Sequence, residues 1–89
     1  MILAYTKRFK RSYKKMDKNS QELIKEALKM LAENSKHPSL RVKKMQGYHN
    51  LYVWEASANL NIRITFEMEK SDRLILRNCG YDNETLSSP

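Results

Sequence analysis

Cysteine, glycine, proline and long apolar runs are all scarce in this sequence of 89 residues. Cys79 is the only cysteine, so no disulfide bond can form within the chain and an oxidising compartment is not implied. The first apolar run, residues 2–5, is too short for a signal peptide and precedes the basic segment instead of following it. No run approaches the roughly 20 apolar residues of a membrane-spanning helix. These absences predict a cytoplasmic protein with no membrane partner.

The chain also lacks any repeat, low-complexity segment or linker. Residues 1–89 are therefore expected to form a single domain. A chain of this length builds one modest core and has no room for a second lobe. Any functional site must then be a concavity of the surface.

Positive charge is concentrated in the first part of the chain. The chain has seventeen Lys and Arg residues and ten Asp and Glu residues. Residues 1–50 contain thirteen of the basic side chains but only four of the acidic ones. A polyanion is the natural partner, because Lys and Arg bind phosphates and release counterions. A solvated, lysine-rich helix face is the alternative. The basic cluster consists of Lys7, Arg8, Lys10, Arg11, Lys14 and Lys15.

A first helix is predicted over residues 7–16. Phe9, Tyr13 and Met16 share one side of it at helical spacing, and Thr6 is placed to cap its start. The basic cluster occupies the rest of its surface.

A second helix is predicted to start at Asn19, which forms a capping box with Glu22, and to end near Glu33 or Asn34. Its apolar stripe consists of Leu23, Ile24, Ala27, Leu28 and Leu31.

Five strands are expected around these helices, over residues 1–5, 41–45, 51–57, 62–68 and 74–80. The two helices follow each other directly, so they form a hairpin whose apolar faces need a sheet to cover them. The predicted fold class is α+β: a short N-terminal strand and a two-helix hairpin packed on a mainly antiparallel sheet of four to five strands.

Arginines lie among the alternating residues of the last two strands. Apolar side chains at positions 62, 64, 66 and 68 form one face, so Arg63 points away from the core. In the next strand Leu74 and Leu76 are expected in the core, which leaves Arg77 and Cys79 on the other face. A hairpin would then bring Arg63 and Arg77 to one open surface. Solvated arginines, or cross-strand pairs with Glu67 or Glu69, are the alternatives.

Four segments carry a likeness to a known family. They are residues 37–45 (HPSLRVKKM), 51–57 (LYVWEAS), 62–67 (IRITFE) and 76–80 (LRNCG). Together they resemble the RelE/ParE superfamily of small toxins from type II toxin–antitoxin pairs, and within it the RelE and YafQ-like branch. The resemblance extends over nearly the whole chain and implies a RelE-like fold.

The resemblance implies an mRNA interferase, an endoribonuclease that cuts messenger RNA on the ribosome, inhibits translation and is silenced by a cognate antitoxin. In such enzymes the substrate's 2′-hydroxyl attacks the adjacent phosphate, so the protein must supply a base, an acid and positive charge. Arg63 matches the family's strand arginine and is expected to hold the phosphate. The basic cluster, Lys43 and Lys44 would bind RNA, and the antitoxin complex would be the form that meets operator DNA.

The chain departs from the family at its C-terminal pattern Gly-x-His-Asp. Asp82 stands where the histidine would be, and an ionised aspartate is a poor acid but can serve as a weak base. Tyr81, Lys43, Lys44 and His49 are the other candidates for the missing group, with a surface tyrosine in a loose tail and an exposed loop histidine as the ordinary alternatives. The histidines have no carboxylate or thiol at ligand spacing, so neither a metal nor a cofactor is expected.

Two other functions are compatible with the sequence. The ParE branch inhibits DNA gyrase by binding and uses no nuclease residues, which the missing histidine would fit. A decayed toxin that only binds its antitoxin is the third possibility.

Overall fold

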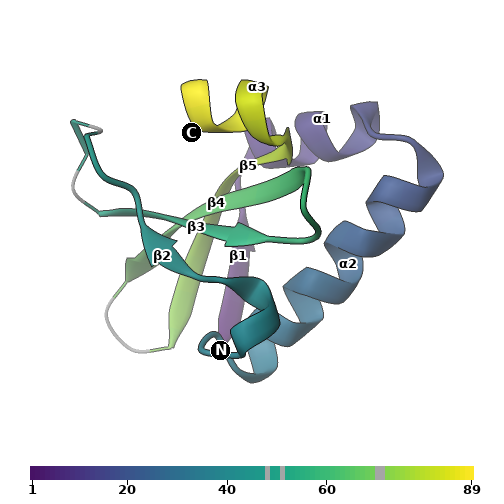
Figure 1. Ribbon diagram of the computed structural model, residues 1–89. Helices are drawn as coiled ribbons and strands as arrows, with labels where there is room; N and C mark the ends of the chain where they lie inside the picture. The colour runs from purple at the N-terminus through teal and green to yellow at the C-terminus, as the bar shows by residue number, and fades with distance from the viewer. Residues whose placement is uncertain (48, 51, 70–71) are drawn as a thin grey trace.

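The computed structural model describes residues 1–47, 49–50, 52–69 and 72–89 as an α+β fold (Figure 1). This fold class and the predicted order of elements are confirmed. The elements in chain order are β1 (Ile2–Tyr5), α1 (Lys7–Lys15), α2 (Lys18–Glu33), the 3₁₀ helix η1 (Pro38–Leu40), β2 (Lys43–Lys44), β3 (Val53–Ser57), β4 (Ile62–Glu69), β5 (Arg73–Tyr81) and α3 (Asp82–Ser87). None of the described helices combines the length and the hydrophobicity that a transmembrane segment requires.

The five strands form one mixed sheet in the order β1-β5-β4-β3-β2. All neighbouring strands are antiparallel except β1 and β5, which pair in parallel at one edge. The other edge is β2, which is only two residues long although five were expected. A short edge strand that carries two lysines is a poor template for further strand pairing.

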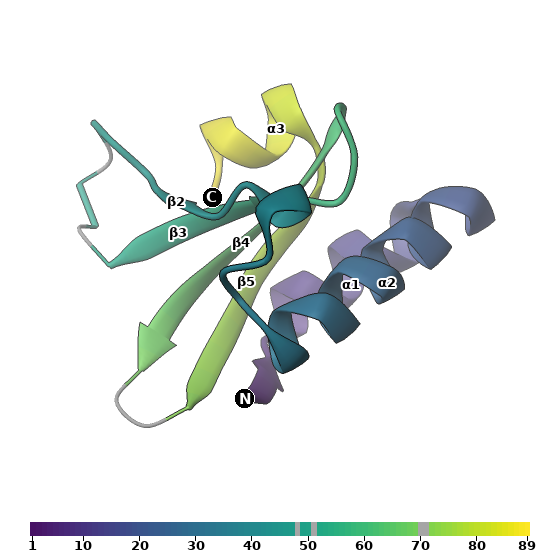
Figure 2. The same ribbon diagram turned by 60° about the horizontal axis from the view of Figure 1, so that its bottom comes forward.

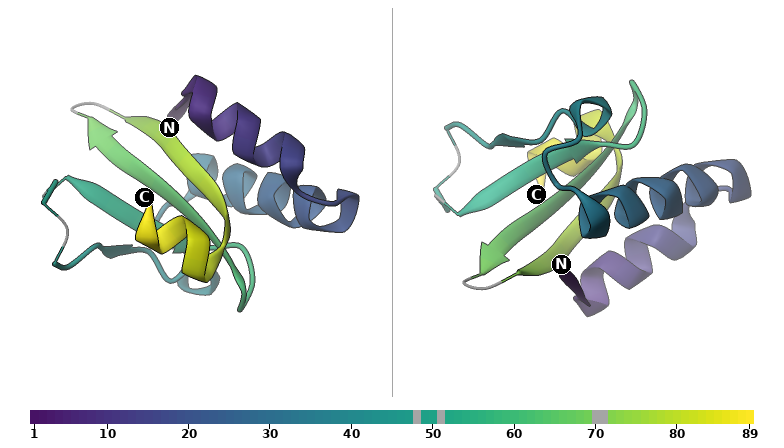
Figure 3. Two further views of the ribbon diagram at one scale, coloured as in Figure 1. Left: turned by 90° about the horizontal axis from the view of Figure 1, so that it is seen from above. Right: turned by 90° about the horizontal axis from the view of Figure 1, so that it is seen from below.

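Helices α1 and α2 run side by side and pack on one face of the sheet (Figures 2 and 3). Phe9 of α1 is buried as predicted, and Tyr13 and Met16 pack against the core from the same side. The stripe of α2 is buried except for Leu23, whose 39% exposure contradicts the prediction. One residue in a helix turns by about 100°, so the side chain next to Ile24 lies at the margin of the buried stripe.

The two helix starts differ in how well the sequence predicted them. The Thr6 hydroxyl accepts a hydrogen bond from the Phe9 N–H at 3.1 Å, as a cap should, and also donates to the Leu76 carbonyl at 2.8 Å. The second helix is capped at Asp17, and Asn19 already lies inside it, so the predicted capping box is wrong. The link between the helices is shorter than the polar sequence suggested.

A β-bulge at Arg77 changes the alternation of β5. Thr65 pairs with Asn78 and Phe66 with Leu76, so Arg77 is an extra residue without a partner in β4. Beyond the bulge, Cys79 lies on the core side, where it is 3% exposed, and its predicted place on the open face is wrong. Burial raises the pKa of the Cys79 thiol to about 12.

The C-terminal residues form a helix rather than a loose tail. Helix α3 crosses the ends of β4 and β5, where Thr85 is buried over Gly80. A Cβ at Gly80 would come within 2.9 Å of the Thr85 hydroxyl, so glycine allows this close packing. The Asp82 N–H donates to the Asn61 carbonyl at 2.8 Å and fixes the start of α3 against the β3–β4 turn.

Candidate active site on the open sheet face

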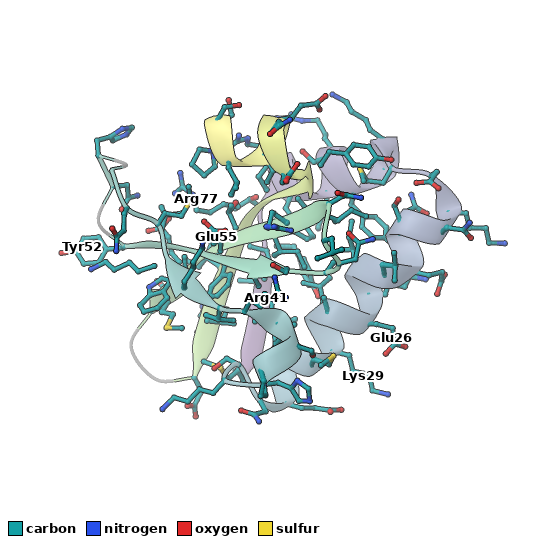
Figure 4. The ribbon with its side chains drawn as sticks, in the orientation of Figure 1. Glu26, Lys29, Arg41, Tyr52, Glu55 and Arg77 are labelled. Atoms are coloured by element: carbon teal, nitrogen blue, oxygen red, sulfur yellow. The ribbon has the colours of Figure 1, made fainter. Side chains whose placement is uncertain are left out.

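The face of the sheet away from α1 and α2 gathers most of the charged strand residues. We call it the open face. Strand alternation and register place there Lys43, Glu55, Ser57, Arg63, Thr65 and Glu67, and the bulge adds Arg77. In Figure 4 the labelled Glu55 and Arg77 lie between α3 and β2. The open face therefore alternates positive and negative side chains.

Arg63 lies on the open face, as the sequence predicted, but its side chain is only 17% exposed. Its Nη1 donates to the carbonyl oxygens of Asn59 at 2.9 Å and Leu60 at 3.1 Å in the β3–β4 turn. Its Nε lies 3.8 Å from Oε1 of Glu55. These contacts fix the guanidinium group, and Nη2, which makes none of them, is the nitrogen that can meet a phosphate.

Arg77 is held by a carboxylate and by the end of the chain. Its Nη1 lies 2.6 Å from Oε2 of Glu67, and its Nε donates to the Pro89 carbonyl at 3.2 Å. The cross-strand pairing with Glu67 that the sequence left open is therefore present. Glu69 pairs instead with Arg73, at 3.1 Å on the exposed hairpin.

Glu55 is a candidate that sequence reasoning missed. Its side chain is 10% exposed and lies beside Arg63, and in the strand register it is opposite Lys43. Lys43, Lys44, Gln46 and Glu55 line a surface hollow of about 530 Å³. A carboxylate at the wall of a hollow, between two cations, is suited to accept a proton from a bound substrate. Alternation along β3 puts Glu55 on the same side as Ser57, and only the register with β4 adds Arg63 to that side.

The two lysines of β2 differ in register but share a hollow. Lys43 is opposite Glu55 on the open face and Lys44 is opposite Trp54, and both line the hollow that Glu55 borders. Both side chains are exposed. His49 is also exposed, in the segment between β2 and β3. Of these three candidates, Lys43 is the one that the strand register places beside Glu55.

Asp82 and Tyr81 flank the start of α3 and differ in position. The Asp82 carboxylate accepts a hydrogen bond from the Asn83 N–H at 2.9 Å, and its backbone is bonded to the turn that also binds Arg63. Asp82 is therefore brought to the same end of the open face as Arg63. Tyr81 is opposite Ile62, a core residue, so it faces away from Arg63 and is 48% exposed.

The basic cluster forms the outer surface of α1, with one exception. Lys7, Lys10, Arg11, Lys14 and Lys15 are exposed. Arg8 instead turns to the C-terminal segment, where its guanidinium donates to the carbonyl oxygens of Ser88 and Pro89. Arg8 thus joins α1 to the C-terminal segment, and its expected role in binding RNA stays a prediction. Over the described part of the chain, no group of three or more His, Cys, Asp or Glu side chains could hold a metal.

Neither a protein-family model nor a curated protein matches this sequence, whereas solved structures do. The YoeB/ParE toxin from Agrobacterium tumefaciens has a TM-score of 0.75 at 16% identity, and the match covers 92% of this chain and 99% of that one. YafQ from E. coli strain BL21(DE3) has a TM-score of 0.77 at 13% identity, covering 93% and 94%. The E. coli DinJ–YafQ toxin–antitoxin complex gives 0.74 at 13% identity, covering 92% of each chain.

These likenesses define the class of fold. It is that of the RelE/ParE toxins, and the sequence-based expectation of a RelE-like fold is confirmed. Within the class, YafQ is among the structures that this chain resembles over almost its full length. The identities are low enough that the likeness is one of fold, and the chemistry must be argued from the residues of the open face.

Proposed function

We propose that this protein is the toxin of a type II toxin–antitoxin pair and an endoribonuclease that cuts messenger RNA bound to the ribosome. The observation that carries the proposal is the Glu55–Arg63 pair, a nearly buried carboxylate 3.8 Å from a fixed guanidinium at a surface hollow. RNA cleavage by an internal hydroxyl needs a proton acceptor next to a phosphate-binding cation, and these two groups have that relation. The shared fold with toxins supports the biological role.

In the proposed reaction the Glu55 carboxylate takes the proton of the 2′-hydroxyl, whose oxygen attacks the phosphorus atom. The bond from phosphorus to the 5′-oxygen breaks, which leaves a cyclic phosphate and a 5′-hydroxyl. Arg63 holds the phosphate oxygens through Nη2, and the Lys43 ammonium gives a proton to the leaving oxygen. The backbone N–H of Asp82 binds the turn that holds Arg63.

The proposed partners follow from the charge distribution. The exposed cations of α1 would contact ribosomal RNA, and the ribosome would bring the messenger to the open face in a fixed geometry, which such a sparse catalytic set needs. A cognate antitoxin would silence the toxin, as the solved toxin–antitoxin complex suggests for YafQ. The site of action would be the cytoplasm, and any operator DNA would be met through the antitoxin complex.

One observation favours a second candidate. Arg63 and Arg77 are each paired with a carboxylate of the same sheet. The resemblance of the sequence to the family further implies that Asp82 stands at the position of the family's histidine. A face whose charges are matched internally can serve binding alone, which fits a ParE-like inhibitor of DNA gyrase or a decayed toxin that only binds its antitoxin.

The test is to add the purified protein to ribosomes programmed with a defined messenger and to map new ends by primer extension. We expect cuts in the decoding site that fall by at least about 10² in rate for Arg63→Ala and Arg63→Lys, since a fixed forked donor is lost in both. Arg73→Ala is the matched control, because Arg73 is an exposed arginine of the neighbouring strand. Uncut messenger with folded wild-type protein would refute the nuclease, and a DNA supercoiling assay would then separate the gyrase inhibitor from the decayed toxin.

A further inference from the structure

A second hollow lies on the helix side of the sheet, away from the open face. It has a volume of about 430 Å³ and is bounded by the segment between α2 and β2 and by β3 and β4. The residues that matter here are Lys36, Pro38, Arg41, Val42, Trp54 and Met68. The proposed cleavage reaction uses none of them.

One wall of this hollow is apolar and contains an aromatic ring. Trp54 packs against the core and is only partly buried, so it contributes to the core and to the hollow at the same time. Met68, 37% exposed, lies on the same side of the neighbouring strand. A partly exposed indole beside a methionine and a proline can stack on a planar, apolar ring.

The other wall is cationic. Arg41 and Lys36 line the hollow. No carboxylate is among the lining residues, and within the described ranges neither of these two cations forms an ion pair. This differs from the open face, where each arginine has an acidic neighbour. Uncompensated cations next to an aromatic ring suit a ligand that is anionic on one side and flat on the other.

The backbone of Arg41 is unusual and supports this assignment. Arg41 has a φ of 48° and a ψ of 45°, the left-handed conformation that a residue with a side chain rarely adopts. Its N–H donates to the Pro38 carbonyl at 3.2 Å, which closes the turn of η1. Glycine would adopt this turn without strain, so the presence of arginine suggests a use for the side chain. Figure 4 shows the labelled Arg41 at the front of the molecule, beside η1.

We propose that this hollow binds one unpaired nucleotide of an RNA strand, with the base stacked on Trp54 and its phosphate on Arg41 and Lys36. RNA as the ligand rests on the proposed function, whereas the site itself takes no part in cleavage. A compact hollow with one indole and two cations favours a nucleotide over an acidic peptide, which would need a longer apolar channel.

Trp54 is the only tryptophan of the chain, so tryptophan fluorescence reports on the surroundings of the ring that lines this hollow. The experiment is a titration of the purified protein with single-stranded oligoadenylate of six nucleotides, without ribosomes, in about 0.1 M salt, where exposed charges are partly screened. We expect saturable quenching. Arg41→Gly should weaken the RNA affinity measured by quenching by about tenfold, because it removes a phosphate contact while keeping the left-handed backbone.

Lys29→Ala is the matched control, because Lys29 is an exposed cation on the outer side of α2 (Figure 4) and should change the affinity less than twofold. Labelled oligonucleotide that binds by anisotropy without quenching Trp54, or that binds Arg41→Gly as well as wild type, would overturn the proposal. So would equal quenching by polyglutamate, which would make the hollow a peptide site. The titration contains no ribosomes, so loss of cleavage with intact quenching refutes only the nuclease, and the reverse refutes only this hollow.

Discussion

The open face and helix α1 both carry several cations, but they differ in whether these cations form ion pairs. On the open face Arg63 lies beside Glu55 and Arg77 beside Glu67, at 3.8 Å and 2.6 Å. On α1 the exposed members of the basic cluster form no ion pair with any described residue. Paired and partly buried charges have fixed positions, whereas unpaired surface charges attract a polyanion with little geometric demand. The comparison suggests that α1 supplies affinity and that the open face supplies chemistry.

The strongest way to break this comparison is to remove the carboxylate at the centre of the open face. Glu55→Gln keeps the shape of the side chain but cannot accept a proton, so cleavage of ribosome-bound messenger should fall by about 10²–10⁴. Ribosome binding should stay unchanged, because the exposed cations of α1 are intact. Primer extension measures the first quantity and co-sedimentation with ribosomes the second.

The control for this prediction is Glu69→Gln, since Glu69 is an exposed carboxylate of the neighbouring strand β4 and pairs with Arg73. It should cut messenger at the wild-type rate. Unchanged cleavage in Glu55→Gln, with wild-type protein active beside it, would move the proton acceptor away from Glu55.

Arg8 is part of the basic cluster of α1, but unlike the other members its side chain is held by hydrogen bonds, as Arg63 and Arg77 are on the open face. Its guanidinium donates to the carbonyl oxygens of Ser88 and Pro89, next to the bond from Arg77 to Pro89. Arg8→Ala should lower the free energy of unfolding by about 1 kcal/mol, because two carbonyl oxygens, one of them in a partly buried contact, lose a charged donor. Lys7→Ala should change it by less than about 0.5 kcal/mol, as a substitution on an exposed surface does.

Urea denaturation of the two variants measures this difference. Equal unfolding midpoints would show that Arg8 contributes no more stability than an ordinary surface cation of α1.

The sequence predicted the parts of the fold that depend on periodicity. Alternation over β4 placed Arg63 on the face opposite the core, and the spacing of Phe9, Tyr13 and Met16 identified the buried side of α1. Both patterns arise because burial of one face fixes which residues are apolar. The elements with the strongest one-sided burial were thus the most predictable.

The features of the fold and the site that the sequence did not predict depend on contacts between residues far apart in the chain. Nothing in the sequence around Arg77 marks a bulge, and this one extra residue moved Cys79 to the core side. Helix α3 has six residues and would be unstable alone, so its existence depends on Thr85 over Gly80 and on the two arginines that hold the last residues. Glu55 became a candidate only when the register showed which cations lie beside it.

The smallest expected effect comes from the exposed side of α1. Lys10→Ala with Lys14→Ala removes two unpaired cations, which should weaken binding to ribosomes only a few-fold at physiological salt. The slope of the logarithm of the affinity against the logarithm of the salt concentration should fall by the amount that corresponds to about two phosphate contacts. The rate of a single round of cleavage on saturated ribosomes should not change, because neither lysine lies on the open face. A plot of the logarithm of the dissociation constant against that of the salt concentration tests the first point, and single-turnover primer extension tests the second. If cleavage fell with binding already saturated, α1 would have to position the messenger as well as attract it, and the division between an affinity surface and a chemical surface would be wrong.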